Sequence, residues 1–93
     1  MIDIGLRPRL VSKARLRFDR HSQSYMLIYP ERGLSLNATA AAVVELCDGA
    51  HSVGEIVVIL QQRFEQAAPA RIEHEVEDFM QLLVYRGLIE GHA

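Results

Sequence analysis

Few residues in this chain are of types that could perform chemistry, and the single cysteine, Cys47, is the first to consider. A catalytic thiol needs a nearby base and an accessible, electropositive setting. His51 follows four positions later, but Gly49 lies between the two and is expected to end the helix that holds Cys47. Because Cys47 also falls on the apolar stripe of that helix, we interpret it as a small buried hydrophobic residue and treat a thiol enzyme as the remotest alternative.

The four histidines, at positions 21, 51, 74 and 92, form no ligand pattern. No two of them have the spacing of ligands on one helix, and the chain has no C-x-x-C pair. It also contains no glycine-rich phosphate loop and no nucleophile elbow. We therefore predict a protein that is not an enzyme and that uses neither a metal nor a cofactor.

The length and composition predict one folded domain over residues 1–93, because a second core would have too few residues to be stable. No apolar run approaches the length that spans a membrane, and the first ten residues do not resemble a secretory signal. A single cysteine also fits a reducing compartment. The expected location is therefore the cytoplasm, with no membrane contact.

Three strands are expected in the first part of the chain. Residues 1–12 lack periodicity and are expected to form an extended arm. Apolar residues alternate with polar ones from Ala14 to Asp19, and further strands are expected at Tyr25–Tyr29 and Leu34–Leu36. Because the connections are short, the three strands should pair as an antiparallel meander.

Three helices are expected to follow. Asn37 is a suitable N-cap for the first helix, which Asp48-Gly49 should end. The second opens with the capping-box pattern Ser52-Val-Gly-Glu55, and the third has Pro69 in its first turn and ends at Gly87. In each helix, apolar residues at helical spacing predict a buried stripe. The stripes are Ala40, Val43, Val44 and Cys47; Val53, Ile56, Val57, Leu60 and Phe64; and Ile72, Val76, Phe79, Met80 and Leu83.

The predicted fold class is α+β, with a three-stranded antiparallel meander followed by three helices, and it resembles a winged helix-turn-helix. That resemblance raises the alternative of a DNA-binding regulator, in which the third helix would enter the major groove. The first half of this helix carries four carboxylates, which oppose contact with phosphates. We therefore predict that the chain does not bind nucleic acid. The four are Glu73, Glu75, Glu77 and Asp78.

Charge and the expected sheet edge favour a protein or peptide partner. Residues 1–32 hold seven Lys or Arg and three Asp or Glu, whereas residues 33–93 hold three and nine. Leu34–Leu36 closes the meander beside the amphipathic third helix, and no later strand is expected to pair with it. Such an edge can add an extended peptide, whose alternate side chains enter the groove between strand and helix. The same surface could instead close a homodimer, with strands exchanged between protomers.

Several ordered blocks of the sequence resemble the PqqD family, which belongs to the biosynthesis of the redox cofactor pyrroloquinoline quinone. The resemblance covers roughly residues 8 to 89. The blocks are Arg15-Leu-Arg-Phe-Asp19, Leu27-Ile-Tyr-Pro-Glu31, Gly33-Leu-Ser-Leu-Asn37, Thr39-Ala40, Leu46-Cys-Asp-Gly49, Val53-Gly-Glu-Ile56 and Arg86-Gly-Leu-Ile89.

The resemblance implies a non-catalytic peptide chaperone that binds the ribosomally made precursor peptide PqqA and presents it to the radical SAM enzyme PqqE. In the wider class of peptide-recognition domains, the peptide lies along the third strand and against the third helix. On this chain, the resemblance implies contacts from Gly33, Leu34, Ser35 and Leu36 on the strand. It also implies contacts from some of these helix residues: Ile72, Glu75, Val76, Phe79, Met80, Leu82 and Leu83.

Overall fold

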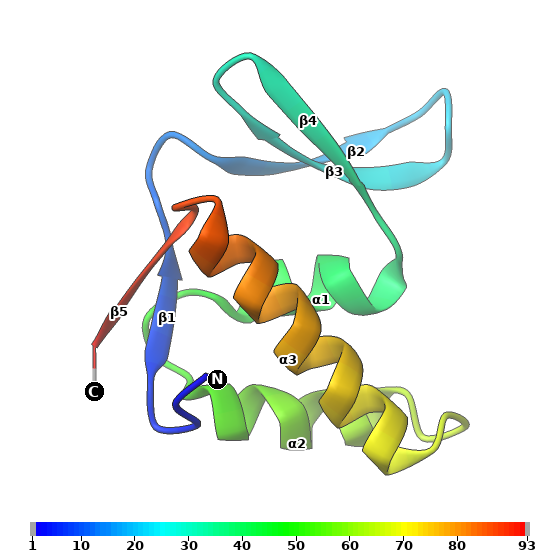
Figure 1. The fold of residues 1–93 in the computed structure, drawn as a ribbon. Helices are drawn as coiled ribbons and strands as arrows, with labels where there is room; N and C mark the ends of the chain where they lie inside the picture. The colour runs from blue at the N-terminus through cyan, green and yellow to red at the C-terminus, as the bar shows by residue number, and fades with distance from the viewer. Residues whose placement is uncertain (1, 93) are drawn as a thin grey trace.

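Two small sheets and three helices make up residues 2–92, which are the residues that the computed structural model describes (Figure 1). The predicted α+β class, with an antiparallel meander followed by three helices, is confirmed. The elements in chain order are β1 (Arg7–Leu10), β2 (Arg15–Asp19), β3 (Ser24–Tyr29), β4 (Arg32–Leu36), α1 (Ala38–Leu46), α2 (Val53–Arg63), α3 (Pro69–Tyr85) and β5 (Ile89–His92).

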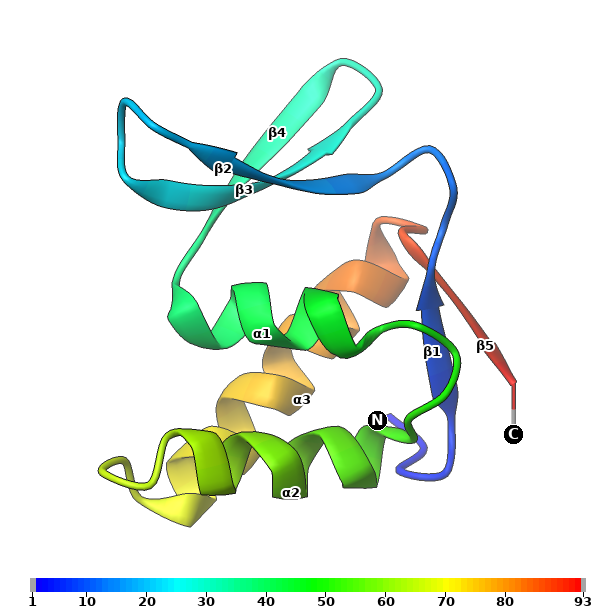
Figure 2. The same ribbon diagram turned by 180° about the vertical axis from the view of Figure 1, so that it is seen from behind.

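The meander has the strand order β2-β3-β4, and both of its connections are hairpins. Side chains alternate between its two faces, so Leu27 at the centre of β3 is fully buried while its neighbours Met26 and Ile28 point the other way. The inner face packs on α1, and the outer face turns away from the helices. Figures 1 and 2 show the meander above the three helices.

The second sheet pairs the two ends of the chain and was not predicted. β1 lies antiparallel to β5, with Pro8 opposite Gly91. The segment expected to be an extended arm therefore contains a paired strand, and Pro8 within it is fully buried. Leu88, which follows α3, returns to the core and is only 1% exposed.

The helix boundaries follow the capping signals. The Asn37 side chain accepts a hydrogen bond from the Ala40 N–H at 2.8 Å, and Ser52 and Glu55 form both bonds of the capping box. At the end of α3, Gly87 has a φ of +68°, and the Leu88 N–H donates to the Leu83 carbonyl as in a Schellman motif. α1 ends slightly earlier than expected, at Leu46.

The core lies where the helices meet the inner face of the meander. Contacts with the sheet on one side and with α2 and α3 on the other bury α1 over more than one stripe, so Ala41 and Ala42 are buried as well. In α2 and α3 the buried residues follow the predicted stripes, while Phe64 and Phe79 are only half-buried. The largest core side chains, each at most 1% exposed, include Leu27, Ile56, Leu60, Ile72, Met80 and Leu83.

Candidate functional site

β4 is an edge strand of the meander, and its side away from β3 is open. β3 pairs with one side of β4, and no backbone hydrogen bond from elsewhere in residues 2–92 reaches residues 32–36. A strand edge with unpaired N–H and C=O groups is a template for another extended chain. The predicted open edge at the end of the meander is therefore present.

The register of the hairpin decides which backbone groups of β4 point to this edge. The two-residue turn Pro30-Glu31 closes on the pair Tyr29 and Arg32. Hydrogen-bonded and non-hydrogen-bonded pairs alternate along an antiparallel ladder. Counted from the turn, Gly33 and Ser35 fall in the non-hydrogen-bonded pairs. Their N–H and C=O groups are therefore directed away from β3, toward the open edge.

A hollow of about 290 Å³ lies where β4 leads into α1, opposite one face of α3. Phe79 and Leu82 of α3 form its apolar wall, and Glu75 and Asp78 of the same helix add two carboxylates. These four positions have the spacing of one helix face, beside the face that packs in the core. We call this hollow the α3 groove. The residues on its other side follow directly after β4 and are Asn37, Thr39 and Ala40.

The carboxylates of the α3 groove have neighbours on their own helix. Glu75 lies 3.2 Å from the Arg71 guanidinium, and Asp78 lies 3.2 Å from His74 Nε2. The side chains of Arg71, His74 and Asp78 are mostly exposed, so these contacts are screened by solvent and are weak. The groove therefore presents negative charge beside an apolar surface.

The predicted site residues fall into three groups. Gly33, Leu34 and Ser35 lie on the open edge, whereas Leu36 is 5% exposed and belongs to the core. The second group, which lines the α3 groove, is Glu75, Phe79 and Leu82. The third group packs in the core and does not line the α3 groove: Ile72, Val76, Met80 and Leu83.

The prediction missed four groove residues: Asp78, Asn37, Thr39 and Ala40. Asp78 could have been found, because it lies three positions after Glu75 on the same helix face. The other three line the groove only because α3 packs across the start of α1, which no local pattern indicates.

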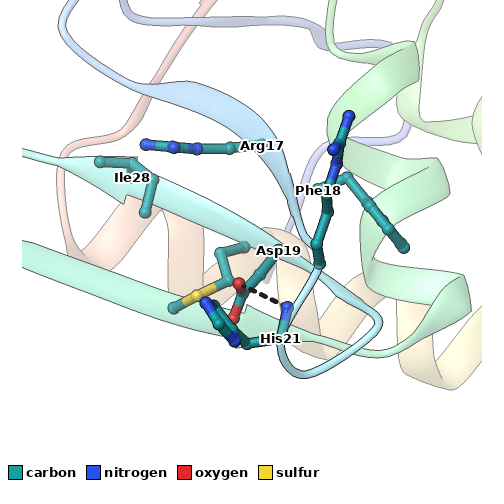
Figure 3. Close-up of a pocket in the computed structure, with 7 residues that line it drawn as sticks. Arg17, Phe18, Asp19, His21 and Ile28 are labelled. Carbon is teal, nitrogen blue, oxygen red and sulfur yellow. Dashed lines mark hydrogen bonds between the residues drawn. The ribbon is translucent and has the colours of Figure 1, made fainter.

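The outer face of the meander carries a larger hollow, of about 480 Å³ (Figure 3). Met26 and Ile28 of β3 give it apolar surface. The Asp19 carboxylate accepts hydrogen bonds from the Ser22 hydroxyl and the His21 N–H, which hold the pKa of Asp19 below its ordinary value. Asp19 thus stabilises its own turn. The lining residues are Arg17, Phe18, Asp19, Arg20, His21, Met26 and Ile28.

Cys47 is a framework residue. It is 4% exposed, and its burial, together with the nearby charge of Asp48, raises the pKa of its thiol to about 12. His51 does not approach the thiol as a base, because its Nδ1 lies 3.0 Å from the Asp48 carboxylate. The interpretation of Cys47 as a buried hydrophobic residue is confirmed.

Within residues 2–92, no three His, Cys, Asp or Glu side chains come together as they would around a metal ion. None of the described helices has both the length and the hydropathy needed to span a bilayer.

Fold and site together define a small α+β domain with an open strand edge beside a helix groove, the arrangement that receives an extended peptide as an added strand. The chain belongs to the family described as coenzyme PQQ synthesis protein D (PqqD), whose model matches residues 24–89. It is 35% identical to the PqqA binding protein of Methylococcus capsulatus over 75 residues, which cover 81% of this chain and 77% of that protein. It is 37% identical to the PqqA binding protein of Klebsiella pneumoniae over 68 residues, covering 73% and 72%.

Two solved structures share the fold. The PqqD truncation of Methylobacterium extorquens PqqCD, described as a functional, stand-alone recognition element for ribosomally synthesized and post-translationally modified peptides, superposes with a TM-score of 0.74 at 37% identity. The match covers 89% of this chain and 87% of that one. TbiB1, solved in complex with the TbiA(beta) leader peptide, gives a TM-score of 0.70 over 91% and 98% of the two chains. Its 17% identity indicates a common fold only.

Proposed function

We propose that this chain is a peptide chaperone of pyrroloquinoline quinone biosynthesis that binds the precursor peptide PqqA along β4 and in the α3 groove. The observation that carries the proposal is the open edge of β4, which has free backbone groups and ends at the α3 groove. The two relatives from Methylococcus capsulatus and Klebsiella pneumoniae are named PqqA binding proteins, which supports the choice of peptide.

The geometry suggests how the peptide would be held. Gly33 and Ser35 supply N–H donors and C=O acceptors, so the peptide main chain would extend the meander by one strand. Side chains of the peptide that point inward would meet Phe79 and Leu82. Main-chain bonds would provide sequence-independent affinity, and the groove would provide selectivity.

We further propose that the bound peptide is presented to the radical SAM enzyme PqqE and that this chain performs no step of the chemistry. The groove residues include no activated nucleophile, and the one thiol is buried and protonated at neutral pH. A peptide held as an edge strand keeps one edge and one face open, which would let an enzyme reach it. A cytoplasmic location is part of this proposal.

Other occupants of the site are tested by the same experiment. A second copy of the chain could pair with β4 in the same way, so a homodimer would compete with the peptide. Duplex DNA is disfavoured because α3 carries exposed or half-exposed carboxylates along its first half: Glu73, Glu75, Glu77 and Asp78.

The test is a titration of ¹⁵N-labelled protein with synthetic PqqA, followed by amide shifts and calorimetry. We expect the largest shifts in β4 and on the groove face of α3, with α2 unchanged as the internal control. Phe79→Ala should weaken binding because it removes the apolar wall of the groove. The proposal fails if β4 and α3 remain silent, or if duplex DNA rather than the peptide perturbs α3. Sedimentation at each point would reveal a competing homodimer.

A further inference from the structure

Gly33 has no side chain, and the tips of two β3 side chains reach toward the space that one would take on the outer face of β4. A Cβ placed on Gly33 would lie 3.1 Å from Met26 Cε and 3.5 Å from Ile28 Cδ1. Ile28 is the cross-strand partner of Gly33, and Met26 is the partner of Ser35, the next outward-facing position. The tips of Met26 and Ile28 therefore lean toward the open edge and occupy space that a side chain at position 33 would take.

These tips are accessible apolar surface. Met26 and Ile28 are half-buried, they are not part of the core cluster, and both line the open hollow on the outer face of the meander (Figure 3). Gly33 itself is exposed. Apolar surface of this kind, next to a strand edge with free hydrogen-bonding groups, can be covered by the side chains of a strand that is added there.

We propose that Gly33, Met26 and Ile28 form a second subsite for the bound peptide, on the face of the sheet opposite the α3 groove, and that it takes one large aromatic or aliphatic side chain. This inference rests on the proposed strand addition to β4. A peptide residue opposite Gly33 would place its side chain on the outer face, where Gly33 has none. The Cβ atoms of directly opposite residues lie about 5 Å apart. Its side chain would cross the glycine and pack on Met26 and Ile28, as aromatic side chains do opposite edge glycines.

The subsite implies a two-sided pattern in the peptide. Residues on either side of the one over Gly33 point to the inner face, which is the helix side of the sheet, where the α3 groove lies at the end of β4. The protein would therefore contact alternate peptide residues on opposite faces of the sheet. One apolar peptide residue would point outward over Gly33, and its neighbours in the peptide would point inward. A peptide shifted by one residue would place its side chains on the wrong faces, so the two subsites together would fix the register.

The test is calorimetric titration of PqqA and of single-alanine PqqA variants into wild-type protein and into the double variant Met26→Ala, Ile28→Ala. Both side chains point away from the core, so the double variant should remain folded, which urea unfolding checks. We expect its affinity for PqqA to fall about tenfold. Replacing one large apolar residue of the peptide by alanine should weaken binding to wild-type protein but have little further effect on binding to the double variant. That residue is then identified as the one over Gly33. Arg17→Gln is the matched control, because Arg17 lies on β2, opposite Met26 of β3, and is therefore away from the open edge of β4.

Gly33→Val provides a second measurement, because valine favours a strand but its side chain would take the space beside the tips of Met26 and Ile28. It should weaken binding, and because the Met26 tip is flexible and can move aside, the free energy of unfolding should change little. If PqqA binds to wild-type protein and binding is lost in Ser35→Pro, but Met26→Ala, Ile28→Ala and Gly33→Val both bind like wild type, the second subsite is wrong and strand addition stands. If PqqA does not bind to wild-type protein, the proposed function itself fails.

Discussion

β1 and β4 are short strands of four and five residues, but they differ in how many of their edges are hydrogen-bonded. β1 is bonded on both sides: β5 pairs with one edge, while on the other the Leu10 N–H donates to the Cys47 carbonyl and the Gly49 N–H donates to the Pro8 carbonyl, each at 2.9 Å. β4 is bonded only to β3. A strand saturated on both edges can only hold the fold together, whereas a strand with one free edge can also bind.

β2 also has a free edge, and it shows why an open edge alone does not make a site. Its outward-facing residues include Arg15 and Arg17, which are exposed. Charged side chains along an edge discourage the addition of another strand. On β4 the corresponding positions are Gly33 and Ser35, which are small and uncharged, and the α3 groove lies beside its end.

Leu10→Pro should produce the largest effect, on stability. It removes the N–H that bonds to the Cys47 carbonyl and a half-buried side chain, so the free energy of unfolding should fall by about 3 kcal/mol. Urea unfolding followed by circular dichroism measures it. A loss no larger than that in Ser35→Pro would contradict the distinction between the saturated and the open strand.

Ser35→Pro tests the open strand. Proline removes an N–H that points away from β3, so the free energy of unfolding should change by less than about 1 kcal/mol while affinity for PqqA falls at least tenfold, or about 1.4 kcal/mol. Calorimetry measures the affinity. Ser35→Ala is the control, because it keeps the N–H and should bind like wild type. Unchanged affinity in a folded Ser35→Pro protein would exclude this donor from binding.

Alkaline pH should lower the free energy of unfolding through Cys47, whose carbonyl bonds to β1. Burial and the Asp48 charge raise the pKa of the folded thiol to about 12 from its ordinary value near 9, so between these pH values the unfolded chain loses a proton that the folded chain keeps. Stability from this group is therefore complete below about pH 9 and falls above it, by about 1 kcal/mol at pH 10. Urea unfolding of wild type and Cys47→Ala from pH 8 to 10 isolates it. Parallel pH profiles for the two proteins would show that the thiol does not contribute.

The smallest effect is expected from the charges of the α3 groove. Glu75→Gln with Asp78→Asn should lower affinity about threefold for a peptide that carries Lys at a groove-facing position, and not for the same peptide with Met there. Added salt should reduce the difference. Glu73→Gln is the matched control, because Glu73 is exposed on α3 but does not line the groove. An equal effect from Glu73→Gln would point to the overall charge of the helix instead.

Much of the local structure could be predicted because its signals lie within a few residues. Asn37, the Ser52 and Glu55 pair, and Gly87 mark helix ends through bonds to their own turns. The pairing of β1 with β5 joins residues about eighty positions apart, and Pro8 inside β1 argues locally against a strand. That sheet could not be predicted from neighbouring residues.

By itself, the sequence determined the meander, the three helices, the burial of Cys47 and the place where the meander stops at β4. These features depend on side-chain periodicity and on caps, which act over one or two turns. Only the tertiary structure decided which face of α3 is free. Phe79 and Met80 are adjacent apolar residues on one helix, but packing buries Met80 completely and leaves Phe79 on the groove. A helix stripe indicates which residues can be buried, whereas the elements packed against it determine which of them are.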